Sequence, residues 1–205
     1  MLPLTVAVAG FGISYGLLAR SAGFSPLAAV VMSGTTFAGS AQFASASILE
    51  AGGAVASAVT AAVLLNARYG PIGVSVAPVI EGGFWRRFLM AQLVVDESWA
   101  IAARGDGTFD RGRLIGAGLV LYVAWTASTA VGALGGELLG DPNALGLDAA
   151  FPALFLALLW PQVRGARALV ASLLGAGIAV ALIPVATPGV PIVAASVACL
   201  VGLRR

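Results

Sequence analysis

The sequence predicts an all-α fold, a polytopic helical membrane protein with about six to eight spans, some of them broken helices. Of its 205 residues, 60% are hydrophobic and 10% are charged. The charges gather in short clusters between long uncharged stretches, such as 21–49 and 168–203. An uncharged helix of ~20 residues crosses a hydrocarbon layer of ~30 Å, whereas a soluble helix needs a polar face. Because the connections are short, we expect one transmembrane domain, 1–205.

The spans should follow the uncharged runs in order. The last run is divided by prolines and a glycine between Pro184 and Pro191, which are typical of a tight turn. Gly12 and Gly16 are one helical turn apart, and we interpret them as a packing face because small residues let membrane helices approach closely. The expected spans are 2–19, 25–49, 54–80, 84–103, 114–134, 149–163, 168–184 and 189–203.

The composition argues against several functional classes. A net charge of +2 does not indicate nucleic-acid binding, because the arginines fall in expected loops and form no basic patch mixed with aromatic residues. The single cysteine, Cys199, excludes an internal disulfide and a cysteine-based metal cluster. No nucleophile–base set or metal-ligand cluster is recognisable, so we expect neither an enzyme nor a metal or cofactor site. Since the chain has no histidine, any proton relay within it must use carboxylates or water.

The loop charges predict an orientation. Cytoplasmic loops carry an excess of arginine, so the basic connections 104–113 and 164–167 should lie inside. The connection 137–148 is acidic and should lie outside. The pair Arg86–Arg87 conflicts with this alternation, because a single crossing by 84–103 would place both arginines outside.

Two expected spans in the first half contain residues that disfavour a continuous helix. The second contains many Gly, Ser and Thr residues between Ser33 and Gln42, and the third is interrupted by Asn66–Pro71. Proline removes a backbone donor, and in lipid such breaks survive where protein or a water cavity satisfies the freed groups. Transporters place broken helices at the membrane midplane. We interpret the second break as functional because Arg68 accompanies it; the alternative is a simple kink.

The fourth span carries two acids. If 84–103 is one helix, Gln92 and Asp96 share a face, and Glu97 is offset by ~100°. An ionised carboxylate at the membrane centre costs ~2.5–3.5 kcal/mol, so it needs a partner, a water cavity or a proton. The alternatives are a purely structural pair with Arg68 and a segment that lies at the membrane interface.

Several motifs follow one another in a specific order. They are Phe11-Gly12 with Tyr15-Gly16, Phe37-Ala38-Gly39-Ser40-Ala41-Gln42-Phe43, Asn66-Ala67-Arg68, Val95-Asp96-Glu97, Trp125, Gly132, and Leu145-Gly146-Leu147-Asp148 before Phe155. In this combination the chain resembles the AzlC family, the large subunits of branched-chain amino acid exporters, over nearly its whole length. Two features depart from the family pattern: the short N-terminus, and Tyr69 where many members have histidine. Substrate choice therefore stays open.

The resemblance implies export of branched-chain amino acids, with methionine as a further candidate, across the bacterial inner membrane. It also implies a small AzlD-like membrane subunit as partner. The resemblance does not identify the coupling ion, although exchange with the proton gradient is the usual expectation. An amino acid needs a donor-rich spot, an acceptor-rich spot and an apolar pocket. Arg68, or a helix N-terminus near Gly39 or Pro71, can hold its carboxylate. Gln42 and Asn66 can bond either end.

The acids are candidates for proton coupling or for binding the substrate ammonium. We favour Asp96 as the proton carrier, because it shares a face with Gln92, and Glu97 as the partner of Arg68; the reverse assignment stays open. Two other classes also stay open, a channel for a small solute and a non-transporting membrane scaffold. An inverted repeat would fit a transporter, since Gly23–Pro26 before the second span is similar to Gly146–Asp148 before 149–163.

Overall fold

A computed structural model describes residues 1–139, 156, 159–160, 163, 165–187 and 189–203. Every regular element in these residues is a helix, and their one strand-like contact is an isolated bridge between Ala103 and Phe109. The predicted all-α class is therefore confirmed for the described part of the chain. The span expected at 149–163 falls almost wholly outside it, as does the Gly146–Asp148 segment of the suggested repeat.

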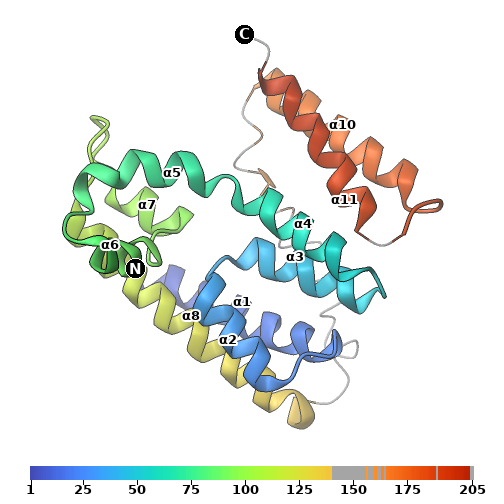
Figure 1. The fold of residues 1–205 in the computed structure, drawn as a ribbon, viewed down its shortest axis with the longest axis horizontal. Coiled ribbons are helices and arrows are strands. Elements are labelled where there is room, and N and C mark those ends of the chain that lie inside the picture. Colours follow the sequence, from blue (N-terminus) through green and yellow to red (C-terminus); the bar gives the residue numbers. More distant parts are fainter. Residues whose placement is uncertain (140–155, 157–158, 161–162, 164, 188, 204–205) are drawn as a thin grey trace.

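The helices, shown in Figure 1, mostly subdivide the expected spans. They are α1 (Leu2–Ser21), α2 (Pro26–Thr36), α3 (Gly39–Glu50), α4 (Val55–Asn66), α5 (Tyr69–Val76), η1 (Ala77–Val79), α6 (Phe84–Ala91), α7 (Asp96–Ala102), α8 (Arg111–Leu139), α10 (Ala166–Leu182), α11 (Val190–Ala195) and η4 (Ser196–Leu203).

Helices α1 and α8 form the long pair on which the rest is built. Among the described helices, these two are long and apolar enough to cross a membrane alone. Gly12 faces Ser128, and Gly16 faces Gly132, so the two helices run parallel. A Cβ added at either α1 glycine would lie less than 3.0 Å from the backbone of α8. The interpretation of Gly12 and Gly16 as a packing face is confirmed.

The second span is a hairpin of two short helices. At ~1.5 Å per residue, α2 and α3 are each shorter than ~20 Å, too short to cross. They are separated at Phe37, whose left-handed φ of 41° is the one positive value among described residues other than glycine. Figure 1 shows the turns before α2 and after α3 at the same end of the molecule. The predicted break is confirmed. The chain turns back at this break, so α3 ends at the same end of the molecule where α2 begins.

The span predicted at 84–103 is wrong as a single helix. Helix α6 ends at Ala91, Val95 is extended (φ −128°, ψ 169°), and α7 begins at Asp96. The cause is Ser98, whose hydroxyl accepts the N–H of Val95 and donates to the carbonyl of Leu93, so it caps a new helix. Gln92 and Asp96 therefore do not share a helix face.

Helices α6 and α7 form a second hairpin, which enters the molecule from the end opposite to that of the α2–α3 hairpin (Figure 1). Glu81, before α6, pairs with Arg111, after α7, at 3.3 Å. Ile80, Ala102 and Leu114 also share one apolar cluster. The start and the end of the hairpin consequently lie together, and α6–α7 crosses nothing.

The hairpin removes the conflict over Arg86–Arg87. These arginines now lie at the end where α8 begins, the end expected to be cytoplasmic. The loop there is ordered by Asp110, which accepts the N–H of Arg113 and pairs with Arg104 at 2.9 Å. Those bonds hold the pKa of the Asp110 carboxyl below its ordinary value.

The remaining helices complete the described part. Helices α4 and α5 follow one line with a break at Ala67–Arg68, where Gly70 bonds the carbonyl of Ala67 and Pro71 has no donor. Helices α10 and α11 form a hairpin whose turn at Gly189 (φ 94°) packs against the α3–α4 end. The turn expected between these two spans is confirmed. That 1–205 is a single domain stays a prediction.

Replacement of Gly16 by valine should force α1 away from α8. We expect Gly16→Val to lower the free energy of unfolding by about 1–3 kcal/mol, because its methyl groups meet backbone rather than flexible side chains. Gly10→Val is the matched control, since nothing lies within 4 Å of a Cβ at Gly10. Thermal unfolding of both variants in the same detergent checks this. Equal stability of the two would contradict the parallel packing.

Candidate functional site

A cavity of about 870 Å³ lies where the helix breaks meet. Its wall is mainly aromatic and aliphatic, with one polar group of side chains. The lining includes Leu4, Val8, Phe11, Phe37, Gly39, Ser40, Phe43, Arg68, Tyr69, Ile72, Val95, Asp96, Glu97, Trp99, Leu121 and Trp125. Such a volume and polarity are typical of a small-molecule site.

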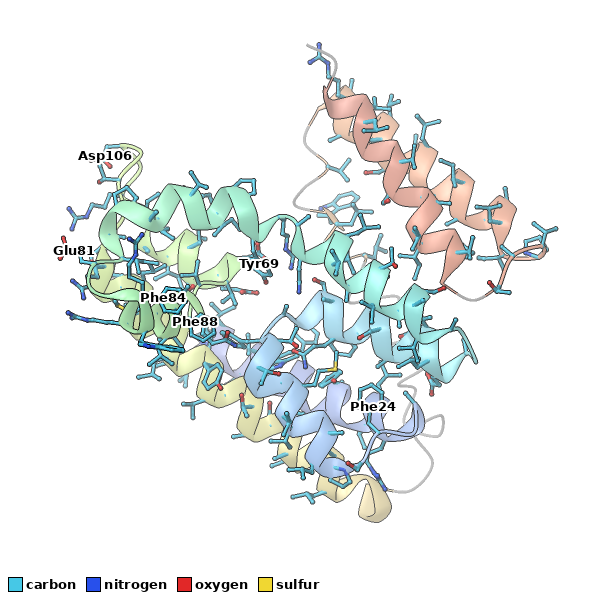
Figure 2. The ribbon with its side chains drawn as sticks, in the orientation of Figure 1. Phe24, Tyr69, Glu81, Phe84, Phe88 and Asp106 are labelled. Carbon is cyan, nitrogen blue, oxygen red and sulfur yellow. The ribbon has the colours of Figure 1, made fainter. Side chains whose placement is uncertain are left out.

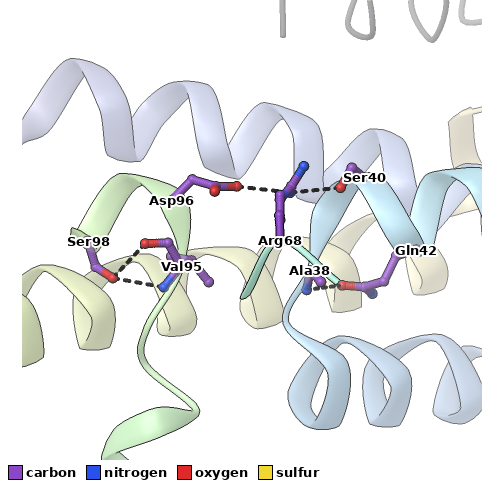
Figure 3. Close-up of polar contacts among 7 residues, drawn as sticks. All are labelled: Ala38, Ser40, Gln42, Arg68, Val95, Asp96 and Ser98. Atoms are coloured by element: carbon purple, nitrogen blue, oxygen red, sulfur yellow. Dashed lines mark hydrogen bonds and ion pairs between the residues drawn. The ribbon is translucent and has the colours of Figure 1, made fainter. Parts of the chain in front are cut away.

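Arg68 is the centre of the polar group (Figure 3). Its Nη2 lies 2.9 Å from Oδ2 of Asp96 and donates to Oγ of Ser40 at 2.9 Å. The guanidinium also lies 5.2 Å from the centre of the Tyr69 ring. The side chains of Arg68 and Asp96 remain 40% and 44% exposed, so both present polar atoms to the cavity.

The expected pairing of Arg68 with Glu97 is wrong, because Asp96 makes the ion pair. Asp96 is the first residue of α7, directly after the extended Val95, and this position carries its carboxylate to Arg68. Glu97 also lines the cavity. No ion pair to Glu97 is present among the described residues.

Each polar member of the site comes from a helix break. Ser40 lies in the first turn of α3, Arg68 between α4 and α5, and Asp96 at the start of α7. Gly39 opens α3 beside the ring of Trp125, which would lie 3.1 Å from a Cβ at that position. The first turn of a helix has unpaired backbone N–H groups, so its end can attract an anion. Of the predicted site residues, the cavity brings together Gly39, Arg68, Asp96 and Glu97.

Gln42 lies away from the cavity wall and is fully buried. Its Oε1 accepts the backbone N–H of Ala38 (3.2 Å) and the indole N–H of Trp125 (3.0 Å). Its Nε2 donates to Ser33, whose hydroxyl bonds Thr129 on α8. Gln42 thus fixes the α2–α3 break and the Trp125 ring that lines the cavity.

Asn66 is also absent from the lining. Its Oδ1 is buried and has no hydrogen-bond partner among the described residues.

Sequence reasoning missed the contact between the two hairpins. Gln92 donates from Nε2 to the carbonyls of Gly34 and Thr35, at 3.1 and 2.9 Å. The hydroxyl of Tyr122 donates to the same Gly34 carbonyl. These bonds join the end of α6 to the end of α2. The position of a polar Gln92 within an apolar run indicates that its side chain has a hydrogen-bond partner. The sequence spacing does not indicate that this partner is the end of α2.

The site can hold a small molecule with charges of both signs and an apolar part. Arg68 and Ser40 form a donor-rich spot, and Asp96 and Glu97 form an acceptor-rich spot next to it. The rings around them supply an apolar wall. A free amino acid has this distribution of groups.

Comparisons with known proteins place the chain among membrane transport proteins. The model of the AzlC protein family matches residues 3–139, which include every lining residue of the cavity. The branched-chain amino acid transport protein AzlC of Bacillus subtilis is 30% identical over 186 residues, covering 87% of this chain and 73% of that protein. The inner membrane protein YgaZ of Escherichia coli is 28% identical over 202 residues, covering 90% and 81%.

An uncharacterised membrane protein of Archaeoglobus fulgidus is 30% identical over 200 residues, covering 96% of this chain and 87% of its own length. No solved structure matches the chain. The family is one of transport proteins rather than enzymes, and its members are membrane proteins. The chain therefore belongs to the AzlC family of membrane transport proteins.

Proposed function

We propose that this chain is the large subunit of a two-component exporter of branched-chain amino acids, and that the cavity around Arg68 binds the substrate. The observation that carries the proposal is the Arg68–Asp96 pair, which together with Ser40 brings polar groups from three helix breaks to one largely aromatic cavity. The name of the Bacillus subtilis relative supports the same substrate class. Methionine is a further candidate, since it has the same charged groups and an unbranched apolar side chain.

The pair suggests how the substrate enters. Arg68 and Asp96 pair with each other across the wall of the cavity. The amino acid carboxylate replaces Asp96 at Arg68, and the ammonium replaces Arg68 at Asp96, so neither charge is left unpaired. The apolar branch then lies against the rings of Phe37, Phe43 and Trp125. A neutral apolar molecule could not separate the pair, and this gives selectivity for free amino acids.

The two hairpins suggest how the cavity is opened. They enter from opposite ends, and their tips meet beside the site at the Gln92 bonds. Broken helices around a midplane site are typical of transporters that expose the site to each side in turn. Displacement of α6–α7 would open the cytoplasmic side, and displacement of α2–α3 the outer side.

Proton coupling is assigned to Glu97 in this proposal. Asp96 forms the ion pair with Arg68, whereas Glu97 lines the cavity with no ion pair among the described residues. A carboxylate without a cationic partner takes up a proton more readily in a closed apolar cavity and releases it when water enters. Export against a gradient would follow from exchange of that proton for substrate.

Export itself is tested in proteoliposomes that contain both subunits. We expect saturable efflux of labelled leucine and valine that is accelerated by an imposed proton gradient. A flux that rises linearly with concentration would point to a channel instead. Complete absence of flux from a well-folded complex would point to a scaffold.

Arg68→Ala should abolish export. The variant removes the donor for the substrate carboxylate and leaves Asp96 without its cation. Because the pair is partly exposed, the loss should be smaller than the ~2–5 kcal/mol of a fully buried pair, and we expect efflux to fall about 10-fold or more. Arg68→Lys should retain part of the activity, because it keeps the charge and loses the geometry of the guanidinium. Arg113→Ala, at the exposed start of α8, is the matched control. Normal leucine export by well-expressed Arg68→Ala would refute the site.

Substitutions of the two acids should separate binding from coupling. Glu97→Gln mimics the protonated state, so we expect loss of concentrative export with exchange across the membrane partly retained. Asp96→Asn removes the negative charge that attracts the ammonium, so we expect a KM raised about 10-fold or more. Measurements of gradient-driven export and counterflow over a pH series distinguish the two. Concentrative export by both variants with unchanged pH dependence would contradict coupling through these acids.

The purified chain alone should show no efflux, because the proposed exporter has two components. Addition of its small AzlD-like subunit to the same vesicles should restore leucine efflux. Vesicles with a denatured small subunit provide the control. Full activity of the single chain would overturn the two-component proposal while leaving the substrate site untouched.

A further inference from the structure

Helix α6 has an apolar face that the described part of the protein leaves uncovered. Phe84, Trp85, Phe88 and Leu89 are between 56% and 73% exposed. The three rings pack against one another, with centroids 5.2 to 6.4 Å apart. On the other side of the helix, Met90 packs against the apolar cluster of Leu114. The aromatic face therefore points away from the protein; Phe84 and Phe88 are labelled in Figure 2.

The same helix carries two cations that form no salt bridge with the described residues. Arg86 and Arg87 are exposed, and neither forms an ion pair among the described residues. The nearby arginines differ, since Arg104 pairs with Asp110 and Arg111 with Glu81. Helix α6 thus has positive charge that no acid of the described chain neutralises.

The position of α6 in the fold places it at one end of the long helix pair α1–α8. The helix has eight residues, so it is about 12 Å long and cannot cross. It follows the connection at Glu81, which pairs with the start of α8, and it lies at the end where the N-terminus and the basic loop are found. Aromatic side chains and arginines together are typical of helices that lie in the membrane–water interface.

We propose that α6 is an interfacial helix that binds the phosphate headgroups of anionic phospholipids through Arg86 and Arg87. The rings of Phe84, Trp85 and Phe88 insert into the boundary between headgroups and acyl chains. Charge complementarity selects anionic lipid over a zwitterionic one, because each arginine near such a surface attracts it several-fold. The inference rests on the membrane location of the chain and does not depend on the substrate.

Quenching of Trp85 fluorescence by brominated lipids tests the proposal on the reconstituted complex. The difference between the parent protein and Trp85→Phe isolates the signal of Trp85. At equal mole fraction, brominated phosphatidylglycerol should quench Trp85 as if it were enriched about fivefold over brominated phosphatidylcholine. The variants Arg86→Gln and Arg87→Gln should each reduce this preference, and the double variant should remove it.

Arg113→Gln is the matched control, because it removes one exposed charge at the same end and leaves α6 unchanged. It should keep the preference. Equal quenching by the two lipids in the parent protein would overturn the proposal. So would a Trp85 that neither lipid quenches, since the face would then be covered by protein. Because no step measures transport, either result is distinguishable from failure of the proposed export.

Discussion

In hydrocarbon, the backbone groups freed where a helix breaks must find partners inside the protein. That constraint accounts for the arrangement of this chain. At the α2–α3 break the amide of Gln42 accepts the N–H of Ala38. At the α6–α7 break Ser98 accepts the N–H of the extended Val95 and donates to the carbonyl of Leu93. Gln92 supplies donors to carbonyls at the end of α2. Gln42, Ser98 and Gln92, which look misplaced in apolar runs, thus each serve a broken backbone.

The same helix breaks also form the site, because they place polar side chains at helix ends. A continuous helix satisfies its own backbone and presents side chains around its sides, whereas a break allows a residue to extend from a helix end into the gap. Ser40, Arg68 and Asp96 occupy such ends, and so residues far apart in sequence meet within hydrogen-bond distance. The parallel pair α1–α8, held close by its glycines, supplies the apolar wall opposite.

Much of this arrangement could be predicted from the sequence. The breaks in the second and third expected spans were indicated by glycine, serine and proline, which leave a local signal. The break between Ala91 and Asp96 was missed because the segment 84–103 contains neither glycine nor proline. Its cause is a serine cap, and Ser98 is equally compatible with a helix interior. The choice of Asp96 over Glu97 as partner of Arg68 depended on that unseen break.

The bonds of Gln92 make the two hairpins parts of one latch. A single amide nitrogen holds two carbonyls of the opposing tip, so neither hairpin can withdraw without releasing the other. The carbonyl of Gly34 keeps the hydroxyl of Tyr122 when the amide leaves, and the carbonyl of Thr35 lies at an exposed bond where water can replace the amide. Separation of the two tips therefore strands no backbone group. The contact can be made and broken repeatedly at the cost of the bonds of one side chain.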